Sequence, residues 1–194
     1  MTIVVAIKDG AVVLMGSDSA ASDDDGEILV QRHPKIFRWN LKSCEILVGF
    51  AGDFATAQLL EYCFKPPPYD KGDDVKYYLV SDLVPALRKF AAKKILKDDV
   101  SPLDMFTTDT SFLLAAQGRI FVLSYNGQVE EPLLPFASIG TGARAANGAL
   151  HALHESGQVH GSLNSWDALQ LSLQAAEAQQ ANVRRPWHMD AVFQ

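Results

Sequence analysis

Hydrophobic positions along the chain fall into short runs that predict strands and longer periodic stretches that predict helices. A first hairpin is predicted from residues 2–7 and 11–16, two β-branched or apolar runs joined by a turn at Lys8-Asp9-Gly10. Nearly every residue of both runs is apolar, which is typical of strands that are covered on both faces. The hairpin is therefore expected inside the domain and not at its surface.

Further strands and helices follow in separate groups. Strands are predicted at 35–39, 44–51, 111–116, 119–125, 136–139 and 187–193, and helices at 53–64, 74–97, 143–155 and 166–180. Residues 17–34 are polar and predict a long loop or loose ribbon, with a solvated turn at 23–26. Asp53 and Ser165 are predicted N-caps, and Pro85 is expected to kink or split the second helix.

The order of these elements predicts the fold class. Runs of strands and runs of helices favour an α+β fold over an alternating α/β fold. Strands that are apolar on both faces favour two sheets stacked between two layers of helices. Neither a linker nor a repeat interrupts the pattern, so residues 1–194 are expected to form a single domain.

Composition and charge exclude several classes of function. The 194 residues include 17 Lys plus Arg and 23 Asp plus Glu, a net charge of −6, and 48% of them are hydrophobic. This balance disfavours a disordered chain and a nucleic-acid binder, because phosphate neutralisation requires clustered basic residues. No apolar run approaches the roughly 20 residues of a membrane span, and no secretory signal is recognisable. We therefore expect a cytoplasmic protein without membrane or nucleic-acid partners.

The common catalytic and cofactor motifs are absent from the sequence. It contains no P-loop, GxGxxG, GxSxG, HExxH or CxxC pattern, so no cofactor or metal is expected. The remaining candidate is Thr2, which is small enough for removal of Met1 by methionine aminopeptidase. An N-terminal threonine supplies a hydroxyl nucleophile and, in its α-amine with a pKa of about 7.7–8.0, a base. By itself this signal is weak, because many chains begin in this way.

Four ordered motifs resemble the proteasome β-subunits and the bacterial HslV peptidases. They are TIVVAIKDGAVVLMGSDS, a lysine before Ile36-Phe37, GFAGD before one helix and SIGTG before another. The resemblance covers most of the chain in the same order and spacing, and it is strongest over residues 2–60 and 138–150. It implies the fold of N-terminal nucleophile hydrolases, a four-layer αββα sandwich of two mainly antiparallel sheets.

The resemblance also implies roles for five residues. These are Thr2 as nucleophile, Asp18 as catalytic aspartate, Lys35 as the family lysine, Gly49 as oxyanion-hole donor and Thr141 in place of the usual serine. A Lys35 ammonium near Thr2 would lower the pKa of the α-amine, and Asp18 would hold that ammonium charged and oriented. Each residue has a structural alternative. Three such alternatives stay open: a strand-end cap for Asp18, a solvated edge charge for Lys35, and relief of crowding for Gly49.

One stretch departs from the family pattern. Proteasome β-subunits carry an aspartate and a serine just after the last helix, which support the threonine amine. Residues 179–184 of this chain are Gln-Gln-Ala-Asn-Val-Arg, so a carboxylate is missing there and Gln180 or Asn182 would have to supply the hydrogen bond. The nucleophile also requires that Met1 is removed.

The function implied by the resemblance is a threonine endopeptidase. Its sites would be enclosed in a homo-oligomeric ring that receives peptides or unfolded protein and works with a separate ATPase unfoldase. Two alternatives remain open at this stage. One is a catalytically inactive ring or scaffold subunit with the same fold, and the other is an N-terminal nucleophile amidase that acts on a small amide.

Overall fold

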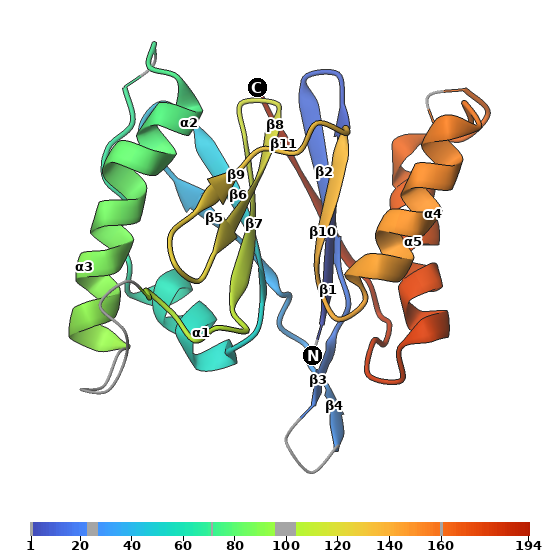
Figure 1. Cartoon of the computed structure of the whole chain (residues 1–194), viewed down its shortest axis with the longest axis horizontal. Coiled ribbons are helices and arrows are strands. Elements are labelled where there is room, and N and C mark those ends of the chain that lie inside the picture. Colours follow the sequence, from blue (N-terminus) through green and yellow to red (C-terminus); the bar gives the residue numbers. More distant parts are fainter. Residues whose placement is uncertain (1, 23–26, 71, 96–103, 160) are drawn as a thin grey trace.

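The computed structural model describes residues 2–22, 27–70, 72–95, 104–159 and 161–194. Two antiparallel sheets are packed face to face, and each is covered on its outer side by helices (Figure 1). This is the α+β, αββα sandwich expected from the sequence, and that prediction is confirmed. The predicted turn at 23–26 and the last part of the predicted helix 74–97 lie outside the described residues.

The first sheet has the strand order β10-β1-β2-β11, with every neighbouring pair antiparallel. Its strands are β1 (Ile3–Asp9), β2 (Val12–Ser17), β10 (Phe136–Gly140) and β11 (His188–Phe193). In β1, Ile3 and Val5 face the outer helices α4 (Ala143–Glu155) and α5 (Ser165–Gln179), whereas Val4 faces the other sheet. Because successive side chains of a strand point to opposite faces, a strand between two apolar layers is apolar throughout.

The second sheet has the strand order β5-β6-β7-β8-β9. Its strands are β5 (Ile36–Asn40), β6 (Glu45–Ala51), β7 (Ser111–Ala116), β8 (Arg119–Ser124) and β9 (Val129–Glu130). Leu47 and Leu113 belong to the core between the sheets, and Val48 and Leu114 pack against the outer helices. Strand β9 was missed in the sequence because two residues carry no periodic signal.

Helices α1 (Phe54–Tyr62), α2 (Val75–Tyr78) and α3 (Val84–Lys94), with a π-helical turn η1 (Leu79–Leu83), cover the second sheet. The turn η1 joins α2 to α3 without a break, and the N–H of Val84 bonds to the carbonyl of Leu79 five residues earlier. Pro85, the second residue of α3, has no N–H to donate to the preceding turn, and it lies just after this π-helical turn. The sequence predicted a kink or a split at Pro85. The structure has a change from π-helix to α-helix just before this residue. Within the described residues, none of the helices has the length and apolar character that crossing a bilayer requires.

The helix caps confirm one prediction and correct another. The Asp53 carboxylate accepts the N–H groups of Ala55 and Thr56 at the start of α1. At the start of α5 the N-cap is Asn164, whose side chain accepts the N–H of Asp167 at 2.9 Å. The prediction of Ser165 as the cap was wrong by one residue, since Ser165 is already helical.

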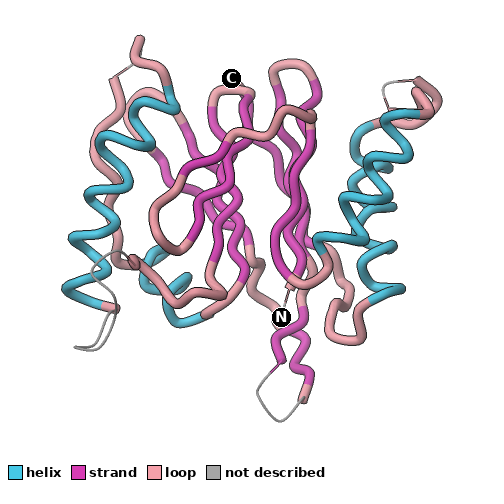
Figure 2. Tube along the Cα trace, in the orientation of Figure 1, coloured by secondary structure: helices cyan, strands magenta, loops and turns pink. Residues whose placement is uncertain are grey.

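A two-stranded ribbon extends from one end of the sandwich. Strands β3 (Ala20–Ser22) and β4 (Ile28–Val30) pair antiparallel and project past the sheets beside the start of β1 (Figure 2). This is the loose ribbon expected for residues 17–34.

Candidate active site

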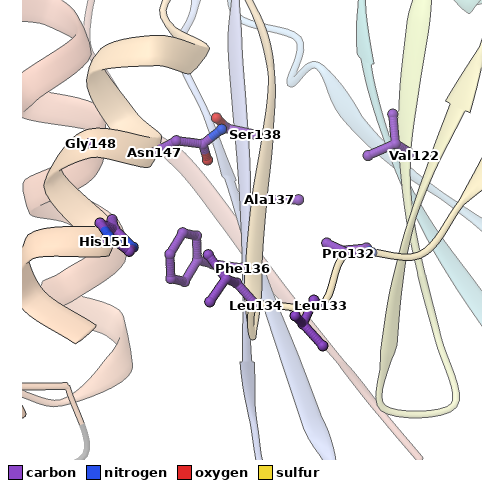
Figure 3. Close-up of a pocket in the computed structure, with 10 residues that line it drawn as sticks. All are labelled: Val122, Pro132, Leu133, Leu134, Phe136, Ala137, Ser138, Asn147, Gly148 and His151. Atoms are coloured by element: carbon purple, nitrogen blue, oxygen red, sulfur yellow. The ribbon is translucent and has the colours of Figure 1, made fainter. Parts of the chain in front are cut away.

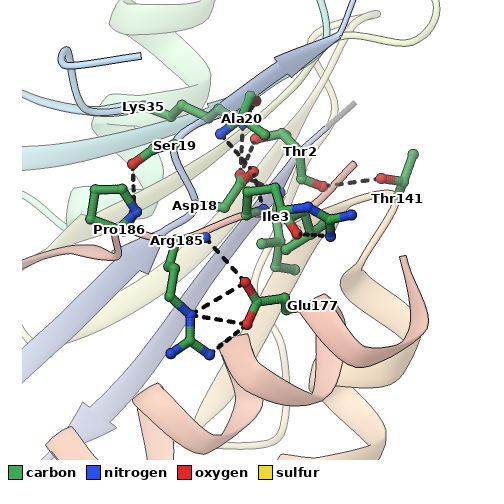
Figure 4. Close-up of polar contacts among 12 residues, drawn as sticks. Thr2, Ile3, Asp18, Ser19, Ala20, Lys35, Thr141, Glu177, Arg185 and Pro186 are labelled. Atoms are coloured by element: carbon green, nitrogen blue, oxygen red, sulfur yellow. Dashed lines mark hydrogen bonds and ion pairs between the residues drawn. The ribbon is translucent and has the colours of Figure 1, made fainter. Parts of the chain in front are cut away.

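Four of the five predicted site residues lie at the end of the sandwich from which the ribbon projects (Figure 4). Thr2 directly precedes β1, Asp18 directly follows β2, and Lys35 directly precedes β5. Thr141 follows Gly140, the last residue of β10, which is paired with the first residue of β1. Strand register thus gathers residues that are far apart in the sequence.

The carboxylate of Asp18 is the centre of this group. Its Oδ1 accepts the Thr2 hydroxyl at 2.8 Å and the Lys35 Nζ at 2.6 Å. Its remaining donors are backbone N–H groups, those of Ile3 at 3.0 Å and Ala20 at 3.1 Å, and that of Arg184 at 3.4 Å. Asp18 is fully buried, so this set of donors replaces water around the carboxylate. A role as a strand-end cap alone does not account for contacts with two side chains.

Lys35 is enclosed and not solvated. Its side chain is 1% exposed, its ammonium also donates to the carbonyl of Ala20, and Nζ lies 5.6 Å from the centroid of the Phe54 ring. Burial lowers the pKa of the Lys35 ammonium, and the neighbouring Asp18 carboxylate opposes that shift. The alternative of a solvated edge charge is therefore wrong.

The GTG motif fixes the backbone of Thr2. The carbonyl oxygen of Thr2 accepts the Thr141 hydroxyl at 3.3 Å and the Gly142 N–H at 3.4 Å. Gly140 has φ +94°, and a Cβ there would lie 2.3 Å from the same carbonyl oxygen, so only glycine allows this approach. Thr141 thus lies beside Thr2 as expected, and it contacts the main chain of the nucleophile candidate.

A cavity of about 350 Å³ opens beside Thr2. Its lining consists of Thr2, Ala51, Gly52, Asp109, Ser111, Gly140 and Thr141. The sequence patterns did not indicate Asp109, which lies two residues before β7, or Ser111, the first residue of β7. The one signal for these two residues is their place at the start of β7, which pairs with β6, the strand that ends in the GFAGD motif.

Gly49 is not among the residues that line this cavity. It lies in the interior of β6, and a Cβ there would lie 2.4 Å from Cγ1 of Val4 and 2.9 Å from Sδ of Met15. The absence of a side chain therefore allows the two sheets to approach. This is the crowding role that the sequence left open as an alternative for Gly49.

The direction of the backbone also turns the Gly49 N–H into the sheet. The N–H of Phe50 bonds to the carbonyl of Lys35, toward β5. Because N–H groups of adjacent residues point to opposite sides of a strand, that of Gly49 points to β7, where Leu113 lies opposite. The glycine of GFAGD that does line the cavity is Gly52, with φ +114°.

The stretch after α5 reaches the site through its backbone. Arg184 donates its N–H to Asp18, and its guanidinium donates to the carbonyls of Gln180 and Val183. Gln180 ends the helix with an N–H bond to Ala176, and Asn182 is buried. The hydrogen bond described from this stretch to the Asp18 carboxylate therefore comes from an uncharged backbone N–H.

A larger cavity of about 690 Å³ lies elsewhere, between α4 and β10 (Figure 3). Its lining is mainly apolar and includes Leu133, Leu134 and Phe136, with His151 at the helix side. None of the five predicted site residues contributes to it. The smaller cavity is lined by Thr2, whose hydroxyl bonds to the buried Asp18.

Solved structures establish the fold class. BPH of Thiobacillus denitrificans in complex with epoxomicin matches with a TM-score of 0.75 and 18% identity, over 99% of this chain and 98% of that chain. Eukaryotic HslV from Trypanosoma brucei matches with a TM-score of 0.69 and 18% identity, over 100% of both chains. At these identities the likeness concerns the fold, which is that of the proteasome-like N-terminal nucleophile hydrolases.

Sequence comparison narrows this class to a family. No protein-family model matches the chain. The ATP-dependent protease subunit HslV of Desulfovibrio desulfuricans is 30% identical over 152 residues, which span 78% of this chain and 77% of the relative. The chain belongs to the HslV family of proteasome-like peptidases, and the resemblance seen in its motifs is confirmed.

Proposed function

We propose that this chain is a threonine endopeptidase in which Thr2, exposed by removal of Met1, is the nucleophile. The observation that carries the proposal is the hydrogen bond from the Thr2 hydroxyl to Asp18, the same carboxylate oxygen that pairs with the buried Lys35. Thr2 also lines a cavity that can receive a substrate.

The chemistry requires the free α-amine of Thr2 as base. At the ordinary pKa of about 7.7–8.0 a fraction of that amine is neutral near pH 7, and the ammonium charge of Lys35 favours this neutral form, which accepts the hydroxyl proton. The oxygen then attacks the substrate carbonyl carbon, and the amine returns the proton to the leaving nitrogen as the peptide bond breaks. A water molecule, deprotonated by the same amine, hydrolyses the resulting ester and regenerates Thr2.

The remaining residues position this reaction. Asp18 orients the hydroxyl, and Thr141 with Gly142 fixes the carbonyl of Thr2. For the oxyanion we propose the backbone N–H of Gly52 in place of that of Gly49, because Gly52 lines the cavity. Such a donor typically contributes about 3–4 kcal/mol to the barrier reduction.

We also propose a homo-oligomeric cytoplasmic ring that acts on peptides or unfolded protein and is served by an ATPase unfoldase. The support is the family relative, which is itself a subunit of an ATP-dependent protease. The exposed Gly148 of α4, where a Cβ would meet no other atom, suits close approach of a neighbouring subunit.

The nucleophile is tested with a fluorogenic peptide and intact mass. Thr2→Ala should abolish hydrolysis, and Thr2→Ser should retain measurable turnover, since the hydroxyl remains. Mass spectrometry should show loss of one methionine, and epoxomicin should inhibit the wild-type enzyme. Full turnover by Thr2→Ala would refute the assignment, and retention of Met1 together with inactivity would favour the inactive ring subunit.

Assembly is tested by light scattering at micromolar concentration. A ring gives a mass that is a multiple of the 21.2 kDa chain. An active monomer would refute the enclosed ring and favour the small-amide hydrolase. For the ATPase partner, ATP-dependent degradation of a folded protein is expected only when an unfoldase is added.

A further inference from the structure

The cavity beside Thr2 has an uneven distribution of charge. Of its seven lining residues only Asp109 has an acidic or basic side chain. Thr141 and Ser111 add hydroxyl groups, and Ala51 adds one methyl group. The described lining therefore combines polar and apolar surface in about equal parts, and it carries one carboxylate.

Hydrogen bonds fix the loop that carries Asp109. The Thr110 N–H bonds to the carbonyl of Thr107 at 2.8 Å, and the hydroxyls of the same two residues lie 2.7 Å apart. The Thr110 hydroxyl also accepts the N–H of Asp53 at 3.3 Å. The loop fits closely against the end of β6, because a Cβ on Gly52 would lie 2.8 Å from the Asp109 carbonyl oxygen. Asp109 is thus held at a defined place beside the nucleophile candidate.

Two other acids of this region, Asp18 and Asp53, are already used by the fold. The Asp18 carboxylate is buried and paired with Lys35. The Asp53 carboxylate accepts two N–H groups and the Thr56 hydroxyl at the start of α1. Asp109, in contrast, is exposed and lines the cavity. Its carboxylate is therefore available to a ligand.

Resting on the proposed peptidase function, we infer that Asp109 is a specificity-determining residue that selects peptides with Lys or Arg next to the scissile bond. A long cationic side chain pairs with the carboxylate and places its charge where hydroxyl groups accept further hydrogen bonds. An apolar side chain gains no charge pairing from the Asp109 carboxylate, and an acidic one would be repelled by it.

The direct test uses internally quenched peptides that differ only at the residues flanking the scissile bond. Arg is compared with citrulline, which has nearly the same shape without the charge, and with Glu. We expect kcat/KM to be about tenfold higher for Arg than for citrulline on one side of the bond, and the ratio to fall as salt is added. Equal rates for Arg and citrulline on both sides would overturn the inference.

Variants assign the preference to Asp109. Asp109→Asn should reduce the Arg-to-citrulline ratio to about one, and Asp109→Lys should favour Glu peptides. Asp70→Asn, which removes an exposed charge from the loop between α1 and α2, is the matched control and should keep the wild-type ratio. If Asp109→Asn lowers kcat/KM equally for all peptides and shifts the pH profile of the enzyme, Asp109 acts on the Thr2 amine. That result would overturn the specificity role.

Binding separates this inference from the peptidase proposal. The Thr2→Ala protein keeps Asp109, so fluorescence anisotropy should show tighter binding of the Arg peptide than of the citrulline peptide. If the wild-type chain hydrolyses no peptide but Thr2→Ala binds the Arg peptide selectively, the peptidase proposal fails and the charge preference stands. Hydrolysis without charge preference would overturn the role of Asp109 and leave the peptidase proposal standing.

Discussion

Asp18 and Lys35 form an ion pair in which Oδ1 and Nζ lie 2.6 Å apart and the side chains are 0% and 1% exposed. The pair joins the two sheets, because Asp18 follows a strand of the first sheet and Lys35 precedes a strand of the second. Burial of two charges is favourable only while each has its partner. The residues proposed for catalysis therefore also stabilise the fold.

Removal of one partner should destabilise the protein. Lys35→Met leaves the Asp18 charge without its counter-charge in the interior, and we expect a loss of about 3–5 kcal/mol in the free energy of unfolding. The double variant Lys35→Met/Asp18→Asn removes both charges and should regain part of that loss without regaining activity. Urea unfolding measures both effects. An unchanged urea midpoint for Lys35→Met would contradict the buried pair.

Gly49→Ala should act on stability through contact between the sheets. The new methyl group would meet Cγ1 of Val4 and Sδ of Met15, and overpacking of this kind costs about 1–3 kcal/mol. In a Val4→Ala background the same change should cost less, because the closest atom is gone. Thermal unfolding of the two single variants and the double variant gives the coupling. If the losses of stability in the two single variants simply add in the double variant, the new methyl group does not clash with Val4.

Acid should weaken the fold through His188. Burial lowers the pKa of His188 below its ordinary value of 6.5, the nearby His33 adds to that shift, and Asp18 opposes it. The lowered pKa means that below pH 6.5 the unfolded chain binds more protons at this residue than the folded chain, so stability falls as pH falls.

The matched variants for this effect are His188→Gln and His151→Gln, the second at an exposed position on α4. Urea midpoints measured from about pH 7.5 to about pH 5.5 should fall less in His188→Gln than in the wild type. His151→Gln should retain the wild-type slope. Identical slopes in all three proteins would exclude His188 as a source of acid sensitivity.

The start of α5 provides a test with two adjacent residues. Asn164→Ala removes the side chain that accepts the Asp167 N–H, and we expect a loss of about 1 kcal/mol. The buried Ser165 hydroxyl has no hydrogen-bond partner among the described residues, so Ser165→Ala should be neutral or stabilising. Chemical denaturation of both variants checks the pair. A larger loss in Ser165→Ala would restore the cap predicted from the sequence.

Local patterns in the sequence determined the layers of the fold and most of the strands. The run that became β1 is apolar at every residue from Ile3 to Ile7, and this pattern is favourable only between two buried faces. The ordered motifs also indicated Thr2, Asp18, Lys35 and Thr141, which the structure brings together. These signals are local because side-chain alternation and short motifs depend only on neighbouring residues.

Tertiary structure alone decided which backbone groups and charges face the cavity. Strand direction turns the Gly49 N–H into the sheet. A cavity contact for Gly52 appears only when β6 pairs with β7 and the end of β10, from the other sheet, lies nearby. Asp109 lies far along the chain from Thr2 and has no motif of its own. The burial of Lys35 likewise depends on Asp18 and Phe54 from other elements. These properties arise from contacts between distant segments, which the sequence pattern does not specify.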